Sequence, residues 1–579
     1  MSFQLSDSGS LCINIIKEMT PQNPTVSSFW VSDWIQCLLR TTALNNLPPT
    51  VCARWCFIFS NIIFNAYAYT CKPALRPLDF ANPSGINYWP SSSTGTINIS
   101  FQVWLEYVCQ WMMPLLLNTW LPYSISPYVS PNPAFNQLDP SDPSSYQSIV
   151  NDHTPLPPLD EVSQQAFYNF QSLVTAYFTA RQGDGWLNTF TFNTSYNNRA
   201  NLSYSIDGTN SAPQDLNNLP YPNNWTPVTA PTRTGGTVTK SYLTPEWGTA
   251  NTGVTSSATR LAIQTNVQQL FPDPLTKSAQ WKKEIKDLTD VLSTLNDTEK
   301  LISEYWLQCP GDTVNSTGNY LYGTPSPSGV WIIFADIYLR SNNKSLIDEI
   351  NYYAAISTGI FEASLVAWKI KRTNLQARPV QKVRQSLYNP SQNVNIPIHQ
   401  DWNPKTPVVN GIPEYNTGAY WLPYQTLTTV SPPFPDFVSG HSTFGAVAAR
   451  LLNYLTKSDY VVLNNPVTNL LSFKYTSQLY YNNNAWYNAA INNLFFYPGC
   501  SAVQPSLPSS ESGGFNGALQ VPLSGLRLEY PTWTSMANAN GESRIYGGVH
   551  WESSNQGGLL AGNELADSLW KDIFSSFAS

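Results

Sequence analysis

The sequence has few charged residues and very few histidines. Lys, Arg, Asp and Glu make up 12% of its 579 residues, about half the share that is usual in globular proteins. The net charge is −7 and no basic stripe is present, which argues against a nucleic-acid partner. With only 4 histidines and no CxxC pair, the sequence also argues against a zinc site. Hydrophobic residues still reach 42%, so the chain is globular rather than disordered.

The 8 cysteines lie mostly before residue 110. We expect buried free thiols, because cysteine behaves as a small, usually buried apolar residue. Disulfides within this region are left open.

Neither a secretory signal nor a membrane span is evident. The first residues lack both a basic segment and a continuous apolar segment. The most apolar stretch, residues 101–123, carries Glu106 and Pro114, so we expect a buried helix there. We therefore expect a soluble, intracellular protein, and the sequence leaves its oligomeric state open, including a homo-oligomer.

Hydrophobic residues recur at helical spacing through much of the chain. The expected fold class is mainly α, with helical bundles and long irregular loops. Helices are expected within residues 28–72, 101–123, 160–182, 278–308, 328–340 and 345–371, from Ser439 onward, and from Val549 to near the end. Irregular stretches are expected at 183–258, 380–436 and about 500–540.

We expect a single domain over residues 1–579, because no internal repeat or charged linker divides the chain. Its approximate halves are 1–275 and 276–579. The first half contains an Asn- and Thr-rich surface excursion at 183–258, with short strands. The second half carries the segments with chemical interest.

The first such segment contains Lys371 and Arg378, with Pro379 directly after them. Pro379 disfavours a helical conformation at Arg378, so its guanidinium should project from a bend. Two cations that converge across a bend can hold one anion, although either could also be solvated.

The second segment is Ser439-Gly440-His441, which stands directly before a strongly apolar helix. A helix N-terminus has free N–H groups and a positive dipole end, which favour an oxyanion. Gly440 allows close backbone approach, and Ser439 is either a hydroxyl donor or a helix cap. His441 is placed to transfer a proton, or is a surface histidine.

The third segment runs from Ser543 and Arg544 through two glycines to His550, which opens the last helix. His550 could serve as a nucleophile or as a metal ligand through one ring nitrogen. Taken alone, it could also be a packed histidine at a helix start.

The three segments follow a fixed order: Lys-x6-Arg-Pro, Ser-Gly-His and Ser-Arg-x5-His. This set resembles the motifs of the vanadium haloperoxidases and of the related type-2 phosphatidic acid phosphatases and bacterial acid phosphatases. The surrounding sequence, including PPTVCARW, LTPEWGT and SPPFPDFVSGHSTFGAVAA, is similar to that of bacterial vanadium-dependent haloperoxidase-like proteins. The resemblance covers roughly residues 45–575.

The resemblance implies a role for each motif residue. Vanadate, or phosphate in the same site, would be bound by Lys371, Arg378, Ser439, Gly440, Arg544 and His550. The implied catalytic residues are His441, as acid–base, His550 and Lys371. In this family the last histidine, here His550, binds vanadium or attacks phosphorus.

Other features favour the haloperoxidase branch. The motifs are widely spaced, and the membrane helices of the lipid phosphatases are missing. Trp368 and Phe434 resemble aromatic residues near the halide site of fungal chloroperoxidases, so they are candidates for a halide site. Two family acids are absent: Ser554 stands four residues after His550, and Cys309 stands where an acid follows Tyr-Trp, with Asp312 nearby.

The main hypothesis is a vanadate-dependent haloperoxidase that oxidises halide with hydrogen peroxide to hypohalous acid, which then attacks a small organic acceptor. The first alternative is a phosphatase with His550 as the nucleophile. The second is a non-catalytic structural or binding protein that retains the fold.

Overall fold

Helices make up most of the structure. The computed structural model is 70% helical over the described residues, which also contain three small sheets. The structure describes residues 30–45, 47–71, 95–120, 145–153, 155–186, 204–205, 219–231, 237–250, 254–307, 326–387, 408–409, 412–413, 421, 423–425, 430–463, 473–475 and 528–575.

The elements follow one another from an N-terminal group to a C-terminal group. The first group is α2 (Trp30–Leu44), α3 (Pro49–Thr70), α4 (Phe101–Leu115), the π-helical turn η1 (Leu116–Trp120), α6 (Tyr146–Asp152), α7 (Glu161–Gln182), the 3₁₀ turn η4 (Trp247–Thr249) and α9 (Ser257–Gln268). The second is α10 (Ser278–Ser293), α11 (Asp297–Tyr305), α12 (Ser326–Ser341), α13 (Leu346–Asn374), α14 (Pro379–Leu387), α15 (Gly440–Thr456), α17 (Trp533–Tyr546), α18 (Glu552–Leu569) and the π-helical turn η9 (Trp570–Phe574).

The strands form three short sheets at the margins of the helices. In the first sheet β2 (Val228–Pro231) lies between β1 (Tyr204–Ser205), which is parallel to it, and β3 (Thr237–Thr239), which is antiparallel. The other two are antiparallel pairs: β4 (Val408–Val409) with β5 (Ile412–Pro413), and β6 (Phe473–Tyr475) with β7 (Leu528–Tyr530).

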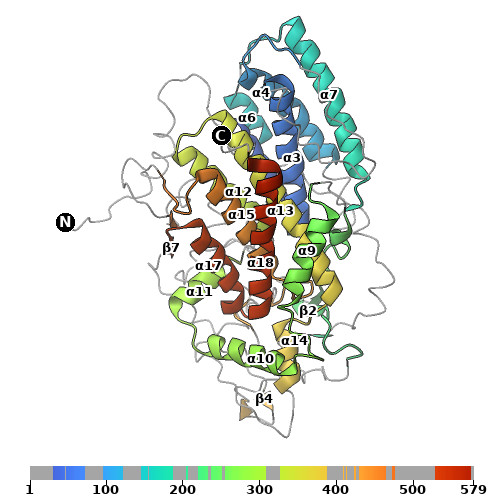
Figure 1. Cartoon of the computed structure of the whole chain (residues 1–579), viewed down its shortest axis with the longest axis vertical. Helices are drawn as coiled ribbons and strands as arrows, with labels where there is room; N and C mark the ends of the chain where they lie inside the picture. Colours follow the sequence, from blue (N-terminus) through green and yellow to red (C-terminus); the bar gives the residue numbers. More distant parts are fainter. Residues whose placement is uncertain are drawn as a thin grey trace, which may run out of the picture.

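Three helices, α13, α15 and α18, lie side by side at the centre of the molecule (Figure 1). Glycines bring α18 very close to α15. A Cβ added at Gly558 would lie 2.6 Å from the Ser439 carbonyl oxygen, and one at Gly562 would lie 2.6 Å from that of Thr443. Only a residue without a side chain fits such an approach, so the start of α15 is held rigidly against α18.

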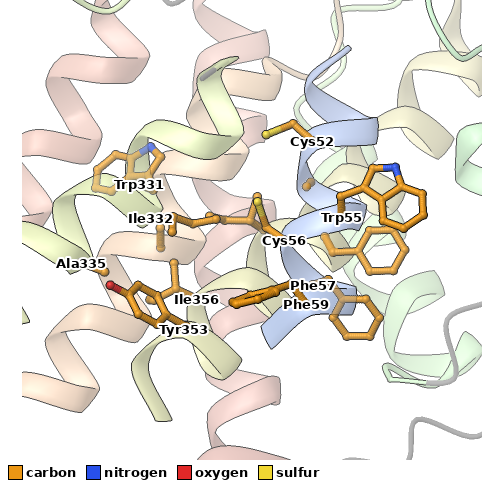
Figure 2. Packing of buried hydrophobic residues seen from close by; sticks show 14 of the residues in the cluster. Cys52, Trp55, Cys56, Phe57, Phe59, Trp331, Ile332, Ala335, Tyr353 and Ile356 are labelled. Carbon is orange, nitrogen blue, oxygen red and sulfur yellow. The ribbon is translucent and has the colours of Figure 1, made fainter. Parts of the chain in front are cut away.

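Helix α3 joins the N-terminal helices to this centre. Figure 2 shows Cys56 and Phe57 of α3 facing residues of α12 and α13, and the Phe57 ring lies 4.8 Å from that of Phe361. Among the described helices α3 is the one long and apolar enough to cross a membrane, but its apolar window is completely buried inside the protein. A core helix has the same composition.

The cysteine and helix predictions can be compared with this fold. The described cysteines are thiols rather than disulfides, as predicted, and Cys37, Cys52, Cys56 and Cys109 are buried. The prediction of burial is wrong for Cys71, which is exposed at the end of α3. The mainly α fold class is confirmed. The stretch 278–308 is divided into α10 and α11, because Asn296 and Glu299 exchange hydrogen bonds that cap the start of α11.

One irregular stretch was predicted wrongly. Residues 380–387 belong to α14 rather than to a loop. Pro379 suits a first helical turn, and Val380 and Val383 are buried in a second apolar cluster with Trp281 of α10 and Trp551. The predicted loop at 500–540 ends earlier than expected, since α17 begins at Trp533; its residues 500–527 lie outside the described part of the chain.

Candidate oxyanion site

The three motif segments meet at one end of the central helices. Lys371 lies in the last turn of α13, Ser439 is the N-cap of α15, and Arg544 lies in the last turn of α17. Arg378 directly precedes α14, and His550 directly precedes Trp551, the N-cap of α18. We call the following residues the anion cage: Lys371, Arg378, Ser439, Gly440, His441, Arg544 and His550. All are buried.

Two of the cage cations are held by backbone carbonyls of one short segment, Phe434–Asp436. Lys371 Nζ donates to the carbonyl oxygens of Pro435 and Asp436, at 2.8 Å each. Arg378 Nε donates to the carbonyl of Phe434 at 2.8 Å. An ammonium has three donors, so Lys371 keeps one N–H group for a ligand when it is protonated.

The His550 ring lies between a cation and a carboxylate. Its Nε2 is 2.9 Å from Arg378 Nη1, and its Nδ1 is 3.0 Å from Asp436 Oδ1. Arginine can only donate and an ionised carboxylate can only accept. The ring is therefore neutral, with its proton on Nδ1 and a lone pair on Nε2 that faces the cage.

The start of α15 supplies the polar groups that the sequence predicted. Ser439 Oγ accepts a hydrogen bond from the Ser442 N–H at 3.3 Å, so the hydroxyl does cap the helix. Its own O–H donor is not used by that bond. At Gly440 an added Cβ would lie 3.4 Å from the nearest atom, in the Trp368 ring, so packing alone does not require glycine here. Close approach of a ligand to the backbone would require glycine at this position.

His441 is fixed at both its backbone and its ring. Its Nε2 is 3.2 Å from the carbonyl oxygen of Leu307, and its own carbonyl accepts from Asn540 Nδ2 at 2.9 Å. Since a carbonyl can only accept, Nε2 carries the proton and Nδ1 is the nitrogen that can take another. Burial, and then the charge of Arg544, hold the pKa of His441 well below its usual range.

The cage is a buried region of positive charge. Burial and the neighbouring Arg378 hold the pKa of Lys371 well below its usual value. Burial and three nearby cations do the same to His550. Burial raises the pKa of Asp436 to about 6, although Arg378 and Lys371 act in the opposite direction. Lys371 and Arg378 thus share one carboxylate, and a bound anion would offset the remaining charge.

The candidate halide residues lie beside Lys371. The Trp368 and Phe434 rings are 5.0 Å apart between centroids, and Lys371 Nζ lies 4.9 Å from the Phe434 centroid. Trp368 Nε1 donates to the carbonyl of Leu243 at 3.0 Å. The indole N–H is therefore in use, and Lys371 is the cation beside this aromatic pair.

Sequence reasoning missed Asp436, although the residue lies only three positions before Ser439. The available signal was an acid just before Ser-Gly-His. Ser554, at the position of an expected acid, is buried, and its carbonyl accepts from the Ser439 N–H at 2.9 Å. Cys309 and Asp312 lie outside the described residues.

Comparisons with known proteins concern the fold and its C-terminal domain. Residues 351–579 match the family model of the VCPO second helical-bundle domain. A bacterial vanadium-dependent iodoperoxidase has a similar structure, with a TM-score of 0.55 and 15% identity over 96% of this chain and 97% of that one. A holo-type bacterial vanadium-dependent chloroperoxidase gives a TM-score of 0.50 and 17% identity over 93% of this chain and 94% of that one. A search of curated proteins by sequence found no match.

The chain thus has the helical-bundle fold of these two vanadium-dependent peroxidase structures. Within this fold, residues 351–579 form a domain of the VCPO second helical-bundle type. At 15–17% identity the solved structures show the shared fold and no more.

Proposed function

We propose that the anion cage binds vanadate and that the protein is a vanadate-dependent haloperoxidase, which oxidises halide with hydrogen peroxide to hypohalous acid. The supporting observation is that Arg378 contacts His550 Nε2 and that two further buried cations, Lys371 and Arg544, are near enough to lower the pKa of His550. When bound, vanadate would supply Lewis-acid chemistry that activates hydrogen peroxide without a change in oxidation state.

The donor set fits a tetrahedral oxyanion. The cations and the Ser439 hydroxyl would bind oxygens, and the Gly440 backbone permits close approach. His550 Nε2 would bind the vanadium atom. Arg378 Nη1 now donates to this nitrogen, so ligand binding would redirect that N–H group to an oxygen of the anion.

Two further groups are assigned by their positions. Neutral His441 would take up the proton of hydrogen peroxide at Nδ1, because Leu307 holds its Nε2. Halide would approach beside Trp368 and Phe434, where Lys371 supplies a positive charge. The solved structures with this fold are named as an iodoperoxidase and a chloroperoxidase, which supports the reaction class and leaves halide preference to experiment.

The test is a paired assay on protein dialysed against vanadate. Hydrogen peroxide is added with iodide, bromide or chloride, and halogenation of a phenol probe is followed; hydrolysis of an aryl phosphate is measured on the same preparation. We expect halogenation with at least one halide and none from His550→Ala. If no halide supports halogenation, the proposal is wrong. Vanadate-sensitive phosphatase activity would then identify the protein as a phosphatase, and inactivity in both assays would indicate a non-catalytic protein.

A further inference from the structure

We infer that Asp436 is the residue that positions His550, by holding the Nδ1 proton so that the Nε2 lone pair points into the cage. The inference rests on the proposed function only for the identity of the ligand. The expected acid four residues after His550 is replaced by Ser554, so the carboxylate comes from a different segment of the chain.

The side chains of Asp436 and His550 are in close contact and are buried from solvent. Asp436 Oδ1 lies 3.0 Å from His550 Nδ1, and the two side chains are 0% and 1% exposed. The Trp551 N–H lies 3.5 Å from the same oxygen, and Arg378 Nη1 lies 3.7 Å from Oδ2. The Asp436 carboxylate therefore faces His550 with one oxygen and Arg378 with the other.

The Asp436 backbone is fixed at both ends, so its carboxylate is presented in one direction. Its N–H donates to the carbonyl of Gln376 at 2.9 Å, and its own carbonyl accepts from Lys371 Nζ at 2.8 Å. The same residue thus fastens a cage cation through its backbone and orients the ring of His550 through its side chain. A carboxylate behind a ligating histidine fixes the tautomer and raises the basicity of the ligating nitrogen.

If Asp436 acted only through its charge, its removal would strengthen vanadate binding, whereas a positioning role predicts weaker binding. Removing a carboxylate from a positively charged site should tighten the binding of any anion. Phosphate can be held by the cage cations, whereas vanadate would also need Nε2. We therefore expect Asp436→Ala to weaken vanadate binding by about 10- to 100-fold and to leave phosphate affinity unchanged or higher. Asp436→Asn, which keeps the shape and an uncharged acceptor, should weaken vanadate binding by less.

The experiment combines calorimetric titration of vanadate and of phosphate with NMR of ¹⁵N-histidine-labelled full-length protein. The sequence has only 4 histidines, so the spectrum is simple. In unligated wild type we expect a protected, downfield Nδ1 proton from His550, assigned with His550→Gln and lost in Asp436→Ala. Signals of His153, which also lies 3.1 Å from two carboxylates, should persist in the variant and show that it is folded.

The matched control is Asp336→Asn, a buried acid paired with Arg340, which should change neither affinity. Equal weakening of vanadate and phosphate by Asp436→Ala would overturn the inference, because it would show a role in folding alone. An Nδ1 proton that persists in Asp436→Ala, or is absent from wild type, would also overturn it. If wild type binds phosphate but no vanadate, the proposed function fails while the NMR result still decides the role of Asp436.

Discussion

Arg378 Nη1 lies 2.9 Å from His550 Nε2, so a cation and a neutral ring nitrogen face each other inside the anion cage. A ligand that takes the Nε2 lone pair must displace this N–H group, which becomes a donor to the ligand. The two residues therefore act as a unit, and a change in one alters what the other can bind.

The guanidinium of Arg378 should not be replaceable by an ammonium. Arg378→Lys keeps the charge but loses the planar fork that contacts Phe434, Val549 and His550 together. We expect vanadate affinity, measured by calorimetry, to fall by about 10- to 100-fold. Arg450→Lys, at a half-exposed pair with Asp567 on α15 and α18, should leave the affinity as it is. An unchanged affinity in Arg378→Lys would contradict this role of the guanidinium.

The two cage histidines should separate binding from turnover. His550→Ala removes the nitrogen that would bind vanadium, so vanadate affinity should fall strongly. His441→Ala removes the proton acceptor, so halogenation should be lost while much of the vanadate affinity remains. For both variants, equilibrium dialysis measures the vanadate affinity and the halogenation assay measures turnover. Equal loss of binding in the two would contradict the roles assigned to them.

The packing of α18 on α15 should control the geometry of the cage. A Cβ at Gly558 would lie 2.6 Å from the Ser439 carbonyl oxygen and 2.7 Å from Ser442 Cβ. Gly558→Ala should therefore cost about 1–3 kcal/mol of stability and weaken vanadate binding by displacing the start of α15. Gly183→Ala, where the nearest atom would be 3.4 Å away, is the control and should change stability by less than about 0.5 kcal/mol. Chemical denaturation of both variants tests this.

His153, which lies among the N-terminal helices, should make the free energy of unfolding depend on pH. Burial works against the charged ring, but its bonds to Asp33 and Glu106 raise the pKa of His153 to about 9. A pKa raised from its usual 6.5 stabilises the fold fully below about pH 6.5, and the contribution is lost as pH rises through about 9. At about 1.4 kcal/mol for each pKa unit, the effect amounts to a few kcal/mol.

The measurement is the free energy of unfolding of wild type and of His153→Gln from pH 6 to pH 10. The difference between them should be largest near pH 6 and should shrink toward pH 10. A difference that is constant with pH would show that folding does not change the pKa of His153, and would contradict this prediction.

The fold could be predicted from the sequence wherever the signal was local. The apolar helix after Ser439 and the helix that ends near Lys371 were expected from hydrophobic spacing and from Pro and Gly. The helix α14 was missed because its apolar face is short and is buried only against α10 and Trp551, which are distant in sequence.

For the site too, contacts between residues distant in sequence could not be predicted. Three ordered motifs were enough to select residues that the fold brings together. Asp436 was not selected, because its partner His550 lies 114 residues further along the chain. A rule that looks four residues after His550 finds Ser554 and predicts a weakened site. In three dimensions a carboxylate does contact the ring, since the loop before α15 and the loop before α18 converge.

The central claim is that the anion cage holds vanadate, and the most direct measurement is the vanadium content of the protein. Wild type and His550→Ala are dialysed with vanadate, freed of excess ligand and subjected to elemental analysis. A vanadium-to-protein ratio near unity in wild type, displaced by excess phosphate and close to zero in His550→Ala, is the predicted result. Wild-type protein that retains no vanadium, or equal retention by the variant, would contradict the account.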